Sequence, residues 1–280
     1  MKVSANNIII LIIVFIIYAL LNTILWHYPS KYYFTILFLQ LLFPLFCYSS
    51  LGSGIIARIL GCTSLQKNKD KDKLYPLFDE VYKDVELYIK NINPNIKLML
   101  DESMEVNAFA IGSNRIAITR GALLQLNEEQ LKGIIAHEFG HLVHGDNFLS
   151  LLLLVGNSYL LILYGSIKFL QLCFALPELI FDGRVWLSKF MASIADLIIS
   201  IGLLIAELLL LINQRTTEYQ ADKFAFDIGY GDELLKALYF LDEFPKGKMT
   251  LMERLKSSHP NTGARIGKLE TLIESERANI

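Results

Sequence analysis

Two histidines and a glutamate near the middle of the chain have the types and spacing of a zinc-protease site. His137 and His141 are four residues apart in the sequence His137-Glu138-Phe139-Gly140-His141. On a helix, residues at this spacing lie on one face about 5–6 Å apart, so both imidazoles can bind one Zn²⁺ ion. Glu138 is then placed to take a proton from a zinc-bound water that attacks a peptide carbonyl. The alternative is a capped amphipathic helix with solvated histidines.

A catalytic zinc ion needs a third protein ligand and one open position, and Glu218 is the candidate for that ligand. Glu218 and Asp222 have helical i, i+4 spacing, so both can face one site. Asp222 would accept a hydrogen bond from the outer nitrogen of a ligand histidine and fix its orientation. Two acids four apart are otherwise an ordinary solvated helix face. His144, three residues after His141, is expected to have a surface or supporting role rather than to be a fourth ligand.

The elements around the motif predict an α+β domain. Asn127 is a natural N-cap for the motif helix, and Gln130 completes a capping box. Gly140 costs helix stability, which indicates a packing or close-approach reason for the glycine. A charged linker over 67–73 precedes these elements. A helix is expected over Tyr75–Asn91, strands over Asn95–Asp101, Ala108–Ile111 and Arg115–Thr119, and a turn over Gly112–Asn114.

The composition predicts an integral membrane protein. The 280 residues are 53% hydrophobic, and the mean hydropathy is positive, which soluble domains seldom combine. Four apolar runs approach the ~20 residues that cross a bilayer: Asn7–Trp26, Tyr33–Leu51 (with a possible continuation to Leu60), Phe148–Ile167 and Phe190–Ile212. The net charge of −2 argues against a nucleic-acid partner. The three cysteines show no pairing pattern, so a disulfide scaffold is not expected.

Basic residues cluster after the second and fourth runs, so the positive-inside rule places both termini and both polar regions in the cytoplasm. The expected organisation is a transmembrane hairpin over 1–60, a cytoplasmic protease part over 61–147, a second hairpin over 148–213 and a second protease part over 214–280. Asp196, Glu207 and Glu218 are spaced eleven apart, close to three helical turns. On one continuous helix they would form an acidic stripe facing the bundle interior; alternatively, Asp196 and Glu207 extend to opposite headgroup regions.

The His137–His141 helix, the Glu218–Asp222 element and the segment Asn107-Ala108-Phe109-Ala110 resemble the M48 metallopeptidases, in particular the HtpX-type heat-shock proteases of bacterial and archaeal membranes. The resemblance covers nearly the whole chain, and the order of its elements matches. It implies a gluzincin-type zinc endopeptidase with one Zn²⁺ per subunit, in the plasma (inner) membrane with its site facing the cytoplasm. It also implies protein or peptide substrates, such as misfolded membrane proteins, within a stress response.

The resemblance also implies roles that spacing alone does not give. Asn107 to Ala110 would form an edge strand that binds substrate backbone, with Asn107 a candidate contact to the scissile peptide. His259, before Pro260, would donate to the developing oxyanion, and Arg265 would lie near the acids. Asp146 matches a family position of undetermined role. A zinc-binding scaffold without catalysis and a protease with one dedicated substrate are the alternatives; the oligomeric state is not predicted.

Overall fold

The computed structural model describes residues 42–65, 70–90, 92–146, 215–243 and 262–278, with isolated positions at 12, 16, 19, 38, 148, 165, 169, 193, 196, 197, 200 and 201. The chain divides into two compact units. The first comprises Met1–Ser4, Phe46–Phe148 and Ile212–Ile280, and the second Ala5–Leu45 and Leu149–Leu211. The predicted spans Asn7–Trp26, Phe148–Ile167 and Phe190–Ile212 lie almost entirely outside the described residues, as does Glu207 of the proposed stripe.

The apolar run that begins at Tyr33 does not continue to Leu60 as one helix. A helix over Leu42–Tyr48 is followed by α3 (Ser50–Ile59), and the two are bent by 77°. Ser49, in an extended conformation, is the N-cap of α3. Among the described residues, no single helix has the length and hydropathy to cross a membrane, whereas this bent pair meets both criteria together.

The first unit contains a four-stranded mixed sheet in the order β1-β2-β4-β3. Its strands are β1 (Thr63–Ser64), β2 (Lys97–Asp101), β3 (Ala108–Ile111) and β4 (Arg115–Thr119). The β2–β4 pair is parallel and the other two pairs are antiparallel. The predicted strands 108–111 and 115–119 and the turn between them are confirmed. β2 begins at Lys97 rather than Asn95, because the Asn95 amide donates instead to the Asn93 side chain at 3.0 Å.

Both faces of the sheet are buried. One face, which includes Leu100, Ile116 and Ile118, belongs to the main core together with α4 (Lys71–Tyr88) and α6 (Glu128–His144). The other face, with Phe109 and Ala117, packs against α3. Alternate side chains along a strand point to opposite faces, so a strand covered on both sides is apolar throughout.

The helix predicted over Tyr75–Asn91 starts and ends earlier, as α4. Its first turn takes in Lys71, Asp72 and Lys73, which the sequence indicated as linker, because Leu74 is fully buried and Lys73 Nζ donates to the Leu123 carbonyl at 3.1 Å. A short helix, α5 (Arg120–Gln125), connects β4 to α6.

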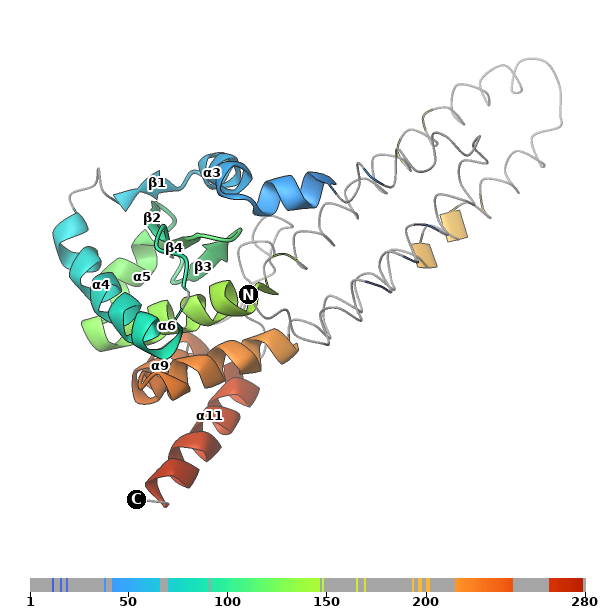
Figure 1. Ribbon diagram of the computed structural model, residues 1–280. Coiled ribbons are helices and arrows are strands. Elements are labelled where there is room, and N and C mark those ends of the chain that lie inside the picture. Colours follow the sequence, from blue (N-terminus) through green and yellow to red (C-terminus); the bar gives the residue numbers. More distant parts are fainter. Residues whose placement is uncertain are drawn as a thin grey trace, which may run out of the picture. The chain divides into compact units, whose positions relative to one another are not determined.

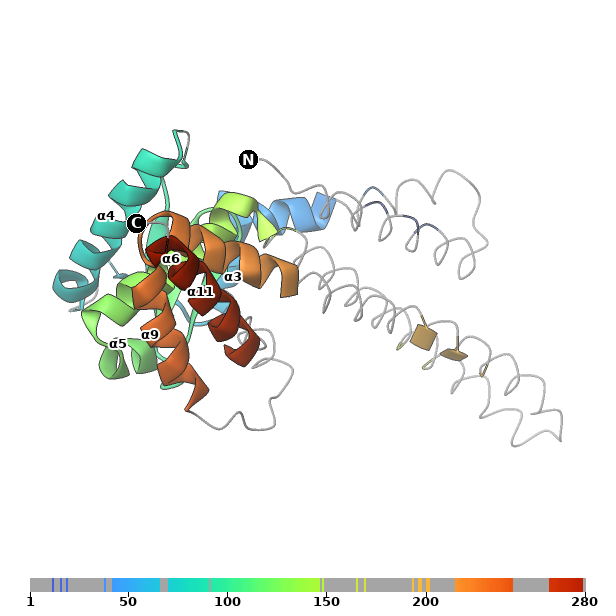
Figure 2. The same cartoon turned by 90° about the horizontal axis from the view of Figure 1, so that it is seen from below.

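α6 lies at the centre of the helical layer, between α4 and α9 (Gly231–Asp242) (Figure 1). The predicted capping box is present: Gln130 N donates to Asn127 Oδ1 at 2.9 Å, and Asn127 N donates to Gln130 Oε1 at 3.0 Å. A helix over residues 215–227 precedes α9, and α11 (Thr262–Arg277) packs against α9 (Figure 2).

Candidate metal centre

His137, His141 and Glu218 come together in the interior of the first unit. One ligand atom from each lies within 4.8 Å of the others, and all three residues are buried. The two Nε2 atoms are 3.2 Å apart. His137 Nε2 is 3.5 Å from Glu218 Oε2, and His141 Nε2 is 3.5 Å from Glu218 Oε1. Ligands that bind one tetrahedral zinc ion at ~2.0–2.1 Å are separated by about 3.3 Å, so the donor set fits this ion.

A close helix approach brings Glu218 to the two histidines. Gly140 lies between His137 and His141, and a Cβ there would be 2.8 Å from Ala221 Cα. A glycine therefore lets residues 215–227 pack directly on α6. A close approach is one of the two reasons that the sequence indicated for Gly140.

The outer nitrogens of the two histidines each face a buried carboxylate. His137 Nδ1 is 2.9 Å from Asp222 Oδ1. His141 Nδ1 is 3.1 Å from Asp146 Oδ2. A proton held at each Nδ1 by its carboxylate would leave Nε2 as the atom with which each histidine can bind a metal ion.

Asp146 is the site residue whose role the sequence left open. Gly145, at φ 72°, ends α6 in the left-handed conformation. The chain then turns back, which brings Asp146 beneath His141. An acid placed directly after a C-cap glycine, one turn beyond a metal-ligating histidine, is the signal that could have identified this role.

Arg265 joins the site to the C-terminal helix. Its Nε and NH2 donate to Asp222 Oδ2 and Oδ1 at 2.8 and 2.6 Å, and its NH1 lies 2.8 Å from Glu218 Oε2. Burial would lower the pKa of Arg265, but the charges of Asp222 and Glu218 raise it above its usual value. Burial would likewise raise the pKa of Asp222, but Arg265 and His137 hold it down at about 2. Both groups therefore stay charged at neutral pH.

Glu138 is 1% exposed and lies near the other charged groups. Its carboxylate contributes to raising the pKa of both His141 and Arg265. For His141, burial acts in the lowering direction and is outweighed by hydrogen bonds to Asp146 and Glu218, so the pKa rises well above its usual value.

The remaining predicted residues that the structure describes do not belong to the cluster of His137, His141 and Glu218. His144 is not part of the cluster; its ring packs edge-on against Phe224, with the centroids 5.9 Å apart. Ala108, Phe109 and Ala110 belong to β3, the last strand in the sheet order. Asn107 precedes it and binds Thr119 through its backbone. His259 lies outside the described residues, so its role stays a prediction.

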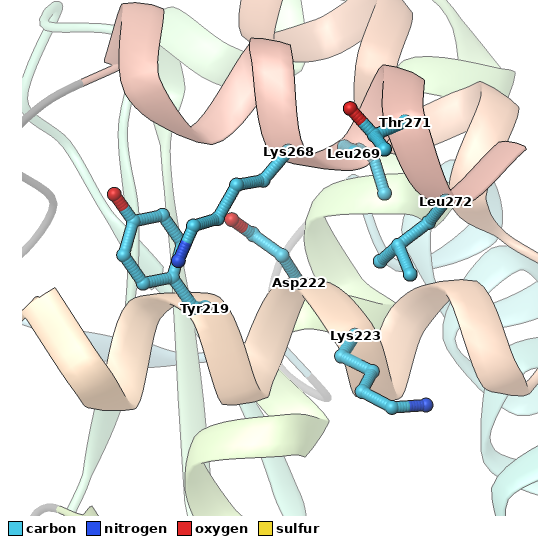
Figure 3. Close-up of a pocket in the computed structure, with 7 residues that line it drawn as sticks. All are labelled: Tyr219, Asp222, Lys223, Lys268, Leu269, Thr271 and Leu272. Atoms are coloured by element: carbon cyan, nitrogen blue, oxygen red, sulfur yellow. The ribbon is translucent and has the colours of Figure 1, made fainter. Parts of the chain in front are cut away.

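A groove of about 350 Å³ runs behind the acids, between residues 215–227 and α11 (Figure 3). Asp222 contributes to its lining, and Lys268 Nζ lies 3.3 Å from the centre of the Tyr219 ring. The other lining residues are Lys223, Leu269, Thr271 and Leu272.

Three known proteins with similar sequences are each described as "Protease HtpX homolog". The chain is 25% identical to the one from Fusobacterium nucleatum over 202 residues, 62% of each chain. It is 26% identical to the Bacillus licheniformis protein over 227 residues, 72% of this chain and 73% of the relative. It is 31% identical to the Methanothermobacter thermautotrophicus protein over 140 residues, 48% of each chain. The chain thus covers less than two thirds of the length of the first and third of these relatives.

The family model "Peptidase family M48" matches residues 78–273, more than half of the chain. The match runs from α4 into α11 and includes the motif helix, the two acids of residues 215–227 and Arg265. This chain belongs to peptidase family M48.

Proposed function

We propose that this chain is a zinc-dependent endopeptidase that hydrolyses peptide bonds of membrane proteins and other protein or peptide substrates. The observation that carries the proposal is the convergence of His137, His141 and Glu218 beside the buried Glu138. Three protein ligands leave one tetrahedral position open, as in catalytic zinc sites, whereas structural zinc sites use four.

A zinc ion held by these three residues would polarise the scissile carbonyl and lower the pKa of a water toward ~7. Glu138 is the general base: it accepts the proton of the attacking water and passes it to the leaving amine. Asp222 and Asp146 keep the Nδ1 protons on His137 and His141. Arg265 engages Glu218 Oε2 and so orients the ligand carboxylate. His259 remains a candidate donor to the oxyanion.

The substrate is proposed to bind as an added strand along β3. In the described sheet, β3 pairs with β4 and is the last strand of the order, so it has an edge at which a peptide can pair. Asn107 stands directly before this strand. A site that recognises backbone in this way accepts varied sequences, which suits the degradation of misfolded membrane proteins.

The proposed location is the bacterial or archaeal plasma membrane, with hairpins over 1–60 and 148–213 and the protease parts 61–147 and 214–280 facing the cytoplasm. The four apolar runs and the distribution of basic residues support this topology. The three similar proteins are named as proteases, and we extend that activity to this chain as part of the proposal.

The test compares bound zinc and peptide cleavage in the parent and in Glu138→Gln and Glu218→Ala, with Glu86→Gln on α4 as an exposed control. Glu138→Gln should keep its zinc and lose about 10²–10⁴-fold in cleavage rate, because the general base is removed. Glu218→Ala should lose zinc as well, and Glu86→Gln should match the parent. A zinc-loaded Glu138→Gln protein that cleaves as fast as the parent would overturn the mechanism.

A further inference from the structure

Helix α3 presents an apolar stripe on the side away from the sheet. Leu51, Ile55 and Ile59 follow one another at i, i+4 and i+8 and are 69%, 42% and 75% exposed. The opposite side of the helix, with Ser53 and Ala57, is buried. Contiguous exposed apolar side chains on one helix face indicate an interaction surface.

The inner side of α3 is firmly attached, so the outward direction of the stripe is fixed. Asn114 Nδ2 donates to Ser50 Oγ at 2.9 Å. Arg115 NH1 donates to Ser53 Oγ and, at 2.8 Å, to Asn114 Oδ1. Ala57 is fully buried against the sheet face that carries Phe109.

The bend before α3 is also built into the sequence. Ser49 Oγ caps the helix by accepting from Gly52 N at 3.2 Å. A Cβ on Gly52 would lie 2.0 Å from the Phe46 carbonyl oxygen, so a glycine is required where the two helices meet. Because of the 77° bend, α3 runs nearly perpendicular to the helix over Leu42–Tyr48. A chain that leaves a bilayer along its normal would therefore continue nearly in the membrane plane.

The charge on the exposed side of α3 is positive. The helix contains no acidic residue, and its one charged residue is Arg58. Arg58 is exposed and lies seven residues after Leu51, on the same helix face. Among the described residues, no carboxylate forms an ion pair with Arg58. An apolar stripe with an exposed, unpaired cation on the same helix face is complementary to the surface of an anionic bilayer.

We propose that α3 is an interfacial helix, with Leu51, Ile55 and Ile59 in the headgroup–acyl boundary of an anionic bilayer and Arg58 at the lipid phosphates. A second copy of the chain is a poorer occupant, because α3 contains no acidic residue that could pair with the Arg58 of the other copy. The inference rests on the proposed membrane location and extends it, since it assigns a lipid-contacting surface to the unit that carries the metal centre.

The experiment uses the full chain, with its three cysteines replaced by alanine, in vesicles of phosphatidylcholine and phosphatidylglycerol. A single cysteine at position 51, 55 or 59 carries a fluorophore, and a fraction of the lipids carries a quencher in the upper acyl chain. Controls are the same label at Leu87 on α4 and Leu124 on α5, which are 83% and 62% exposed but lie on other elements. Flotation of the vesicles measures membrane attachment separately, and zinc-dependent cleavage measures the protease.

Labels on the stripe should be quenched several-fold more than labels at positions 87 and 124, and Arg58→Glu should reduce this difference in anionic vesicles. Equal quenching at all five positions in floating vesicles would overturn the interfacial helix while leaving the protease and its membrane location intact. Label–label contact in detergent, independent of lipid, would assign the stripe to a second copy and reject the proposal. A chain that does not float would reject the membrane location itself.

Discussion

The two histidines of the metal centre are supported in different ways. His141 is held by Asp146, five residues away, at the end of its own helix. His137 is held by Asp222, 85 positions further along the chain, and Asp222 is in turn held by Arg265 of α11. The first support is local and needs a helix end in the right place. The second requires three helices to be packed together.

This difference indicates how the centre is coupled to folding. The long-range support buries the carboxylates of Asp222 and Glu218 together with the guanidinium of Arg265. Buried ions lose their hydration, so each one must be stabilised by its oppositely charged partners. Because Arg265 engages the ligand Glu218 as well as Asp222, the docking of α11 and the shape of the metal centre are linked. The local support depends instead on the end of α6, because Asp146 directly follows the C-cap Gly145.

Removing Arg265 should break the long-range support most severely. Arg265→Met leaves Asp222 and Glu218 buried without their cation and should lower the free energy of unfolding by about 3–5 kcal/mol. Denaturant unfolding of the detergent-solubilised chain measures this. Arg277→Met on the same helix is the matched control: its pair with Asp232 is exposed, with an expected cost of about 0–1 kcal/mol. Equal effects of the two variants would show that Arg265 does not hold α11 in place.

Gly140→Ala should disturb the support of His137 by Asp222 and leave the support of His141 by Asp146 in place. The reason is that it moves residues 215–227 away from α6. The Cβ of the alanine would meet Ala221 Cα at 2.8 Å, so residues 215–227 must shift, at a cost of about 1–3 kcal/mol. Zinc affinity should fall as Glu218 moves, while the His141–Asp146 pair stays intact. Gly267→Ala on α11, where nothing lies within 4 Å, should be neutral or slightly stabilising. Unchanged zinc affinity in Gly140→Ala would contradict the close-approach argument.

The smallest expected difference is in zinc affinity, between a variant of Asp222 and a variant of Asp146. Asp222→Asn and Asp146→Asn should each weaken zinc binding within about 10–100-fold. Asp222→Asn should be the more severe variant, because it also removes the acid that binds Arg265. Competition with a fluorescent chelator gives both affinities, with Asp227→Asn, an exposed acid of the same helix, as control. A larger loss of zinc affinity in Asp146→Asn than in Asp222→Asn would show that the local support of His141 matters more than the long-range support of His137.

Local patterns predicted the elements whose signals lie within a few residues. The capping box at Asn127, the turn at Gly112 and the strands around it follow from short-range hydrogen bonding and alternation. The predicted start of this helix at Tyr75 was wrong. α4 begins at Lys71, because burial of Leu74 extends the helix through the charged residues before it. Strand β1 and helix α5 are too short to leave a periodic signal. The parallel pairing of β2 with β4 joins strands that are not consecutive, and nothing in either strand specifies it.

By itself, the sequence identified the candidate residues of the metal centre: two histidines and a glutamate at helical spacing, and a later pair of acids, with apolar runs around them. These follow from residue type and helix geometry, which are local. The tertiary structure decided which element approaches Gly140, that Asp146 contacts His141, and that Arg265 binds Asp222 and Glu218 together. It also decided that α3 turns away from the apolar run before it and exposes a stripe. Such facts depend on contacts between distant segments, and spacing along a chain carries no record of them.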